Sequence, residues 1–183
     1  MNARAIGVGF CLALIAAAAA CGEASAALVA DSGFRPAKDG YTFPNYVNST
    51  QVPNLGVDEM RRLFGEAVCA GTGGPTCLLS PPAQAWMEQE NLAMAGGHCF
   101  GFAASSLLFW ANAADLGPFG APPVARLKIA GNASLAREIA YAHAFQNLPS
   151  VVGAKVATSP RTVVKTLISS LNASGPLYTL GVV

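Results

Sequence analysis

A glycine-rich turn leads directly into a cysteine and an apolar run at residues 96–103, which read Gly-Gly-His-Cys-Phe-Gly-Phe-Ala. The pattern predicts a helix over about 98–113 with Cys99 in its first turn. Apolar residues point in nearly every direction around that helix, which predicts that it is buried. Free backbone N–H groups and the helix dipole stabilise a thiolate at such a position and lower the pKa of the thiol. The thiolate is the nucleophilic form, so the expected chemistry is acyl transfer to Cys99.

The five cysteines separate by position along the chain. Cys69 and Cys77 flank a flexible, glycine-containing loop that can bring them together, and we expect them to form a disulfide. Cys11 and Cys21 belong to the N-terminal segment, which leaves Cys99 as the odd cysteine. A leftover thiol in an exported protein is a reactive group, a buried inert residue or an intermolecular crosslink.

The segment Cys99-Phe100-Gly101-Phe102-Ala103 resembles the start of the central helix in papain-like cysteine peptidases. A closer resemblance is to a group of secreted bacterial proteins of that fold, and residues 41–46, 61–65 and 81–103 carry it. The resemblance implies an α+β, papain-like fold. Residues 27–183 would supply its helical half, with a buried central helix that starts at Cys99, and the start of its β half. It also implies a peptide or other amide or acyl substrate and no cofactor.

The oxyanion hole departs from the papain-like pattern. In that family a glutamine six residues before the cysteine donates to the oxyanion, and the corresponding residue here is Ala93. Asn91 is a chemically suitable amide, and helical spacing places it on the same face as Met87 and Met94. We therefore hypothesise that Asn91 is an oxyanion-hole donor beside the Cys99 N–H. The alternative is a buried amide that is satisfied within the fold.

The resemblance places the catalytic histidine and its Asn or Asp partner beyond residue 183. Neither histidine of the chain is expected to replace it. His98 and Cys99 are neighbours, and adjacent side chains on a helix diverge by about 100°. We expect His98 to form hydrogen bonds at the mouth of the site, and His143 to lie in the core on the apolar face of its helix.

Apolar residues at three- and four-residue spacing predict further helices over about 57–68, 82–95 and 134–147. Ser134 is the expected N-cap of the last of these. Ser159 followed by Pro160 predicts the start of another helix. Residues 27–56 are expected to be irregular and 177–183 to form a strand. A domain seldom finishes in mid-strand, so we interpret the chain as truncated.

Residues 1–26 have the parts of a secretory signal: Arg4, an uncharged apolar run and small residues at its end. Two processing sites are possible. A lipobox-like stretch would leave Cys21 lipidated, and an A-x-A site that ends at Ala26 would release a soluble protein. The expected location is extracellular or at the cell surface, with a lipid anchor if Cys21 is modified.

Eleven basic and ten acidic residues give a net charge of +1 without a basic stripe, which argues against a nucleic-acid partner. The spacing of His98, Cys99 and His143 does not suit a metal site. The favoured function is an exported papain-like cysteine hydrolase. The alternatives are a transglutaminase-like acyltransferase, which also has Gly-x-Cys before a buried helix, a non-catalytic binding lipoprotein that keeps the fold, and a gene fragment with no function of its own.

Overall fold

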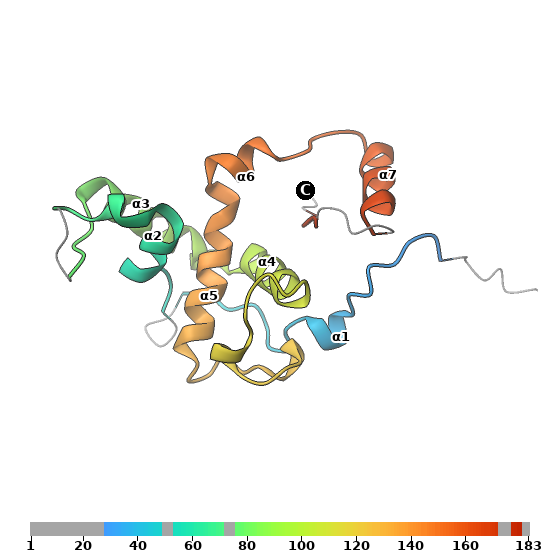
Figure 1. Ribbon diagram of the computed structural model, residues 1–183, viewed down its shortest axis with the longest axis horizontal. Coiled ribbons are helices and arrows are strands. Elements are labelled where there is room, and N and C mark those ends of the chain that lie inside the picture. Colours follow the sequence, from blue (N-terminus) through green and yellow to red (C-terminus); the bar gives the residue numbers. More distant parts are fainter. Residues whose placement is uncertain (1–27, 49–52, 72–75, 172–176, 181–183) are drawn as a thin grey trace, which may run out of the picture.

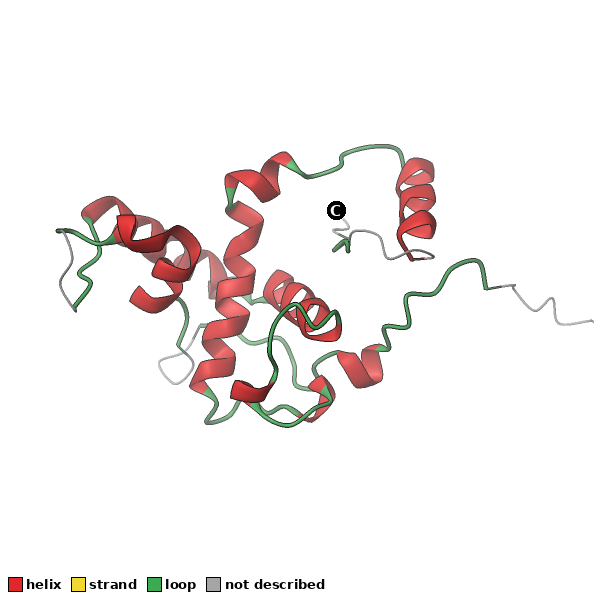
Figure 2. Cartoon of the chain, in the orientation of Figure 1, coloured by secondary structure: helices red, strands yellow, loops and turns green. Residues whose placement is uncertain are grey.

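The computed structural model describes residues 28–48, 53–71, 76–171 and 177–180, and these residues are mostly helical (Figure 2). The helices in chain order are α1 (Pro36–Asp39), α2 (Val57–Phe64), α3 (Pro81–Ala93), α4 (Cys99–Trp110), α5 (Ala133–Ala144), α6 (Pro149–Gly153) and α7 (Pro160–Leu171). Short 3-10 turns follow three of them, at Gly65–Val68, Met94–Gly96 and Phe145–Asn147, and two more lie at Gly117–Phe119 and Val124–Arg126.

The predicted helices all form, with ends that differ by a few residues. The helix expected over 134–147 starts at Ala133 rather than after Ser134. Its N-cap is Asn132, whose Oδ1 accepts a hydrogen bond of 3.1 Å from the Leu135 N–H. An asparagine is as good a cap as a serine, so local preference alone does not separate the two positions. Ser159 caps α7 as predicted, and its Oγ accepts from the Thr162 N–H at 3.3 Å.

The strand expected over 177–183 is not found in its described part. Residues 177–180 have no regular secondary structure, and 181–183 lie outside the described residues. A strand is stabilised by hydrogen bonds to a neighbouring strand, and within the described ranges the sole β-bridge pairs Cys69 with Leu79. The helical part of the expected α+β fold is therefore present, and the sheet part is absent from the described residues.

Helix α5 is the central element of the helical part (Figure 1). Eight of its twelve residues are buried, against five of twelve in α4. The expectation that the helix starting at Cys99 would be the fully buried one is therefore wrong. One side of α4 packs on α5, while Leu107, Leu108 and Trp110 remain half-buried.

Helices α4 and α5 approach most closely at Gly101. A Cβ atom at this position would collide with the carbonyl oxygen of Ile139 and would lie 3.0 Å from the Cβ of His143. Glycine therefore permits a backbone contact that any other residue would prevent. The contact fixes the first turn of α4 against the middle of α5.

Two apolar clusters cover different faces of α5. The first contains Leu135 and Ile139 together with Phe109 of α4, and half-buried aromatic rings such as Phe43 and Phe102 pack against it. The second contains Ala140 and Ala144, with Leu55 and Met94. Positions four apart share a face of a helix. Leu135 and Ile139 therefore lie on one face of α5, and Ala140 and Ala144 lie on the adjacent face.

Two ion pairs connect α2 with α5 in opposite directions. Arg62 of α2 binds Glu138 of α5 at 2.7 Å, and Arg137 of α5 binds Glu59 of α2 at 3.1 Å. Both carboxylates are buried. The guanidinium of Arg62 also lies 3.8 Å from the centre of the Tyr141 ring. These contacts attach α2 to α5, the helix on which α4 also packs.

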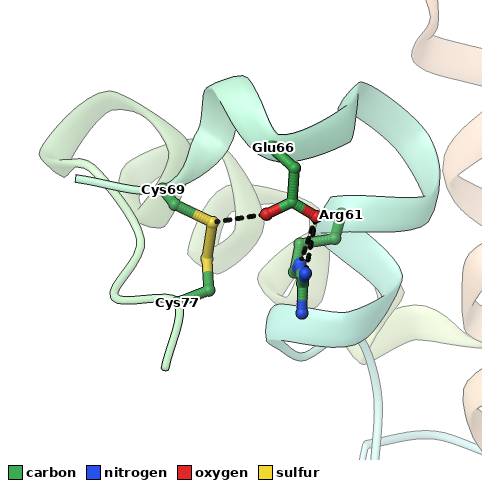
Figure 3. The surroundings of a disulfide bond; sticks show 4 residues. All are labelled: Arg61, Glu66, Cys69 and Cys77. Carbon is green, nitrogen blue, oxygen red and sulfur yellow. Dashed lines mark hydrogen bonds and ion pairs between the residues drawn. A yellow bond between two sulfur atoms is a disulfide. The ribbon is translucent and has the colours of Figure 1, made fainter. Parts of the chain in front are cut away.

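Cys69 and Cys77 form the predicted disulfide, with an S–S distance of 1.99 Å and Cα atoms 5.2 Å apart (Figure 3). The Glu66 carboxylate lies between the disulfide and Arg61. One carboxylate oxygen binds Arg61, and the other is 3.8 Å from the Cys69 sulfur. A disulfide sulfur carries no hydrogen, so the second approach is a contact rather than a hydrogen bond.

Helix α7 lies apart from the other helices (Figure 1), and none of its described residues is buried. Its apolar residues follow one face, and Val164 and Leu171 on that face are 53% and 39% exposed. The predicted apolar stripe is thus present, but it does not contribute to either core cluster.

Candidate functional site

Cys99 is the first residue of α4, and its side chain is exposed and free of any disulfide. The first intrahelical hydrogen bond of α4 runs from the Phe102 N–H to the His98 carbonyl at 3.0 Å. The N–H groups of Cys99, Phe100 and Gly101 therefore precede the helical ladder. Within the described chain, no side chain caps this helix. Cys99 is in the first turn of a helix, as the sequence predicted, and the structure shows that its thiol is exposed beside N–H groups without a side-chain cap.

Gly97 sets the direction in which the chain enters α4. Its φ is +125°, in the region that side-chain-bearing residues rarely adopt. A Cβ there would also collide with the side-chain amide nitrogen of Asn45. The same Asn45 accepts a hydrogen bond of 2.7 Å from the His98 N–H through Oδ1. The turn before Cys99 is therefore fixed by a residue more than fifty positions earlier in the chain.

The ring of His98 is fully buried. Its Nδ1 is 2.9 Å from the Tyr46 carbonyl oxygen, its Nε2 is 2.8 Å from the Asn54 Oδ1, and the Tyr46 ring packs on it at 4.4 Å. Burial lowers the pKa of His98, and the hydrogen bond to the Tyr46 carbonyl opposes that shift. His98, which was expected at the mouth of the site, lies inside the fold. The hydrogen bonds of its ring hold the chain in place directly before Cys99.

Asn54 continues the hydrogen bonding away from His98. Its amide nitrogen donates to the Asn48 Oδ1 at 2.7 Å, and the Asn48 amide nitrogen donates to the backbone carbonyl of Asn91 at 2.6 Å. We name the series from His98 through Asn54 and Asn48 to the Asn91 carbonyl the asparagine relay. Sequence reasoning missed it, because its members are distant in the chain and no local pattern of residues marks them.

The side chain of Asn91 is paired with the backbone of Leu55. Its Oδ1 accepts from the Leu55 N–H and its Nδ2 donates to the Leu55 carbonyl, each at 3.0 Å. Asn91 lies on the inward face of α3, as the helical spacing predicted. The geometry matches the alternative given for this residue, an amide satisfied within the fold.

His143 of α5 is 6% exposed, and its ring centre lies 5.9 Å from that of His98 and 6.5 Å from that of Phe100. The Gln146 side-chain nitrogen lies 2.9 Å from the His143 Nε2. The buried Nδ1 has no hydrogen-bond partner among the described residues. Burial lowers the pKa of His143, a charge on the nearby His98 acts in the same direction, and the backbone of His98 opposes the shift. The core position expected for His143 is observed, next to the first turn of α4.

Other expected site features lie elsewhere or outside the described residues. The secretory signal over 1–26, with Cys21 and the Ala26 site, belongs to the part of the chain that is not described. In the described ranges no group of three His, Cys, Asp or Glu side chains could hold a metal ion. No single described helix has the length and hydropathy to cross a membrane. The pair Pro81–Gly96 and Cys99–Trp110 meets that test only when the two are taken together across a 98° bend.

Comparisons with protein-family models, with curated proteins and with solved structures each found no match to this chain.

Proposed function

We propose that the chain is part of an exported papain-like cysteine hydrolase in which Cys99 is the nucleophile. The observation that carries the proposal is an exposed, unpaired thiol at the first position of a twelve-residue helix without a side-chain cap. Helix N-termini stabilise negative charge through their N–H groups and the helix dipole. Both the thiolate and the oxyanion of an acyl-transfer reaction are negatively charged.

The proposed reaction begins when the Cys99 thiolate attacks an amide or ester carbonyl carbon. A sulfur–carbon bond forms, the carbon–nitrogen or carbon–oxygen bond breaks, and the leaving group takes a proton. Water then hydrolyses the thioester and releases the carboxylic acid and the thiol. In this reaction the Cys99 N–H would donate to the oxyanion, and such donors contribute on the order of 10²–10³ in rate.

The proposal assigns the general base to neither described histidine. Both ring nitrogens of His98 face hydrogen-bond partners inside the fold, and the Nε2 of His143 faces Gln146. We keep Asn91 only as a secondary candidate for the oxyanion hole, because its amide would have to leave Leu55 to reach a substrate.

The disulfide supports the proposed location. A stable disulfide forms in an oxidising compartment and is rare in reducing ones, and Cys69 and Cys77 are joined. We therefore propose that the chain acts outside the cytoplasm, either released after cleavage at Ala26 or anchored through a lipid on Cys21. Mass spectrometry of the protein isolated from its host distinguishes an acylated Cys21 from a chain that begins at residue 27.

The first experiment compares thiol reactivity in the folded chain and in a Cys99→Ser variant. The chain is treated with iodoacetamide from pH 4 to 9, and with p-nitrophenyl acetate as an acyl donor. Mass spectrometry then assigns each label to a cysteine. We expect Cys99 to be alkylated faster than an ordinary exposed thiol at the acidic end of this range. We also expect nitrophenolate release that the Cys99→Ser variant loses. An ordinary alkylation profile together with no acylation at Cys99 would overturn the proposal.

A non-catalytic binding module with the same fold is the second candidate. The observation that favours it is that the polar side chains around the start of α4 are already paired within the fold. Under this hypothesis Cys99 is alkylated at the rate of an ordinary exposed thiol and is not acylated by the ester. The same experiment therefore separates the two candidates.

A further inference from the structure

The asparagine relay has a fixed direction because it ends on a backbone carbonyl, that of Asn91. The carbonyl oxygen of Asn91 can only accept, so the Asn48 amide presents its nitrogen there at 2.6 Å. The Asn48 oxygen then faces Asn54, whose amide nitrogen donates to it at 2.7 Å. The remaining oxygen of Asn54 faces the Nε2 of His98 at 2.8 Å. In this order of bonds, Nε2 must carry a proton.

The other nitrogen of His98 is under the same constraint. Nδ1 lies 2.9 Å from the Tyr46 carbonyl oxygen, which also can only accept. A neutral imidazole has one N–H, and only the imidazolium has two. The complete set of hydrogen bonds therefore corresponds to the doubly protonated ring.

The neutral ring requires a different arrangement. A neutral ring with its proton on Nε2 keeps the relay but sets the bare Nδ1 against the Tyr46 carbonyl oxygen. With the proton on Nδ1 instead, Asn54 must turn its amide so that its nitrogen donates to Nε2, and its oxygen then faces the oxygen of Asn48. Asn48 must turn as well, which places two oxygens together at the Asn91 carbonyl unless Asn48 leaves α3. Asn48 is exposed and can bind water instead, so leaving is possible for it and not for the buried ring.

We propose that the asparagine relay favours the doubly protonated form of His98, so that a proton on His98 and the attachment of Asn48 to α3 stabilise each other. The coupling is reciprocal, as any linkage between two equilibria must be. It does not depend on the proposed function, because Cys99 takes no part in it. Acidification would thereby fasten the segment before α2 to α3 and, through His98, to the start of α4.

The charged and titratable groups around His98 do not supply this coupling. The nearest titratable ring on α5 is His143, 5.9 Å away, and its charged form would disfavour a second cation. Arg137 of α5 lies 3.4 Å from the Asn54 carbonyl and is paired with Glu59 of α2. On α3 the buried acid, Glu90, accepts from Asn147. Tyr46 supplies a carbonyl and a ring face, and burial raises the pKa of its phenol. None of these is a carboxylate paired with the ring, so the Tyr46 carbonyl and the amide relay are the groups that favour the proton.

The test is the pKa of His98, measured by NMR from the carbon-bound ring protons of the full chain. The sequence has two histidines, so a His143→Gln variant assigns the signals. Asn48→Ala removes the surface end of the relay without touching the buried ring. We expect it to lower the pKa of His98 by roughly 0.3 to 1 unit, from the usual strength of one hydrogen bond. Gln89→Ala, which removes an exposed side-chain amide of α3 that is not part of the relay, is the control and should leave that pKa unchanged.

A second variant keeps the proposal testable from the other end. Asn54→Asp supplies an acceptor that cannot turn into a donor, and it should raise the pKa of His98 by about one unit or more. Far-UV circular dichroism verifies that each variant is folded. A shift in Asn48→Ala no larger than in Gln89→Ala, or an upward shift, overturns the proposal. So does a His98 ring that stays singly protonated down to the pH at which the wild-type chain unfolds.

Discussion

At the scale of single residues, the start of α4 depends on two glycines that serve different purposes. Gly97 is needed for its backbone angle and for the space that Asn45 occupies, whereas Gly101 is needed for contact with Ile139. Gly96 meets no atom within 4 Å at the position of a Cβ, and its φ is not in the left-handed region. The neighbouring glycines 96 and 97 therefore form a matched pair for measurement.

We expect Gly97→Ala to lower the free energy of unfolding by at least about 2 kcal/mol, because a strained backbone angle and a steric collision add together. Gly96→Ala should change it by no more than about 0.5 kcal/mol. Urea unfolding followed by circular dichroism measures both. Similar losses in the two variants would show that Gly97 is not held at its observed angle.

At the scale of elements, α5 organises its neighbours through apolar contacts toward α4 and through crossed ion pairs toward α2. Two ion pairs of α2 differ in how exposed their carboxylates are. The Glu138 side chain is 7% exposed and the Glu66 side chain is 73% exposed, although each carboxylate binds an arginine of α2. Burial, rather than the presence of an ion pair, should decide how much each contributes.

Glu138→Gln keeps the shape of the buried side chain and removes its charge. We expect it to lower the free energy of unfolding by about 1.5 to 3 kcal/mol, the usual range for a hydrogen bond to a charged group. Glu66→Gln should have an effect below about 1 kcal/mol. Chemical denaturation of both variants, at low and at high salt, provides the comparison. Equal effects would mean that burial of Glu138 does not increase the contribution of its ion pair with Arg62 to the free energy of unfolding.

The disulfide closes a short loop between the end of α2 and the start of α3, with eight residues of separation. In the chain-entropy account, its reduction should lower the free energy of unfolding by about 2.5 kcal/mol. Urea unfolding with and without a reductant measures this change. A Cys69→Ala, Cys77→Ala variant should match the reduced wild type and should not respond to the reductant. A residual response would assign the effect to another cysteine.

At the scale of the whole molecule, two buried imidazoles lie side by side between α4 and α5. Burial lowers the pKa of both His98 and His143 from the ordinary value of 6.5. The unfolded chain therefore binds protons at a higher pH than the folded chain does. Hydrogen bonding to His98 offsets only part of the effect of its burial. The net stability from the two rings is therefore fully present above pH 6.5 and is lost as the pH falls through the lower folded-state values.

We expect the urea midpoint of the wild-type chain to be lower at pH 5.5 than at pH 7.5. Most carboxylates stay ionised over that interval, so the histidines dominate the change. His143→Gln, which keeps a polar side chain of similar length, should reduce the difference between the two midpoints. A midpoint that rises on acidification would contradict the lowered pKa values.

Sequence reasoning located the helices, the disulfide and the position of Cys99 in the first turn of α4, because each has a local signal. Apolar periodicity marks α2, α3 and α5, and a short loop between Cys69 and Cys77 marks their pairing. The asparagine relay has no such signal, since its members are joined across gaps of six to forty-four residues. The partial exposure of Leu107 and Trp110 was also not predictable, because a helix with apolar residues on all sides is expected to be buried.

The close contact at Gly101 also determines how α4 can tilt. Helices that touch through their backbones cannot slide easily at that point, so α4 can turn about it more readily than it can shift. Gly101 is two residues from Cys99 and nine from Trp110, or about 3 Å and about 14 Å along the helix axis. A tilt that moves the Trp110 end by a given distance therefore moves Cys99 by roughly a fifth as much. Cys99 is therefore the end of α4 that a tilt of the helix about Gly101 displaces least.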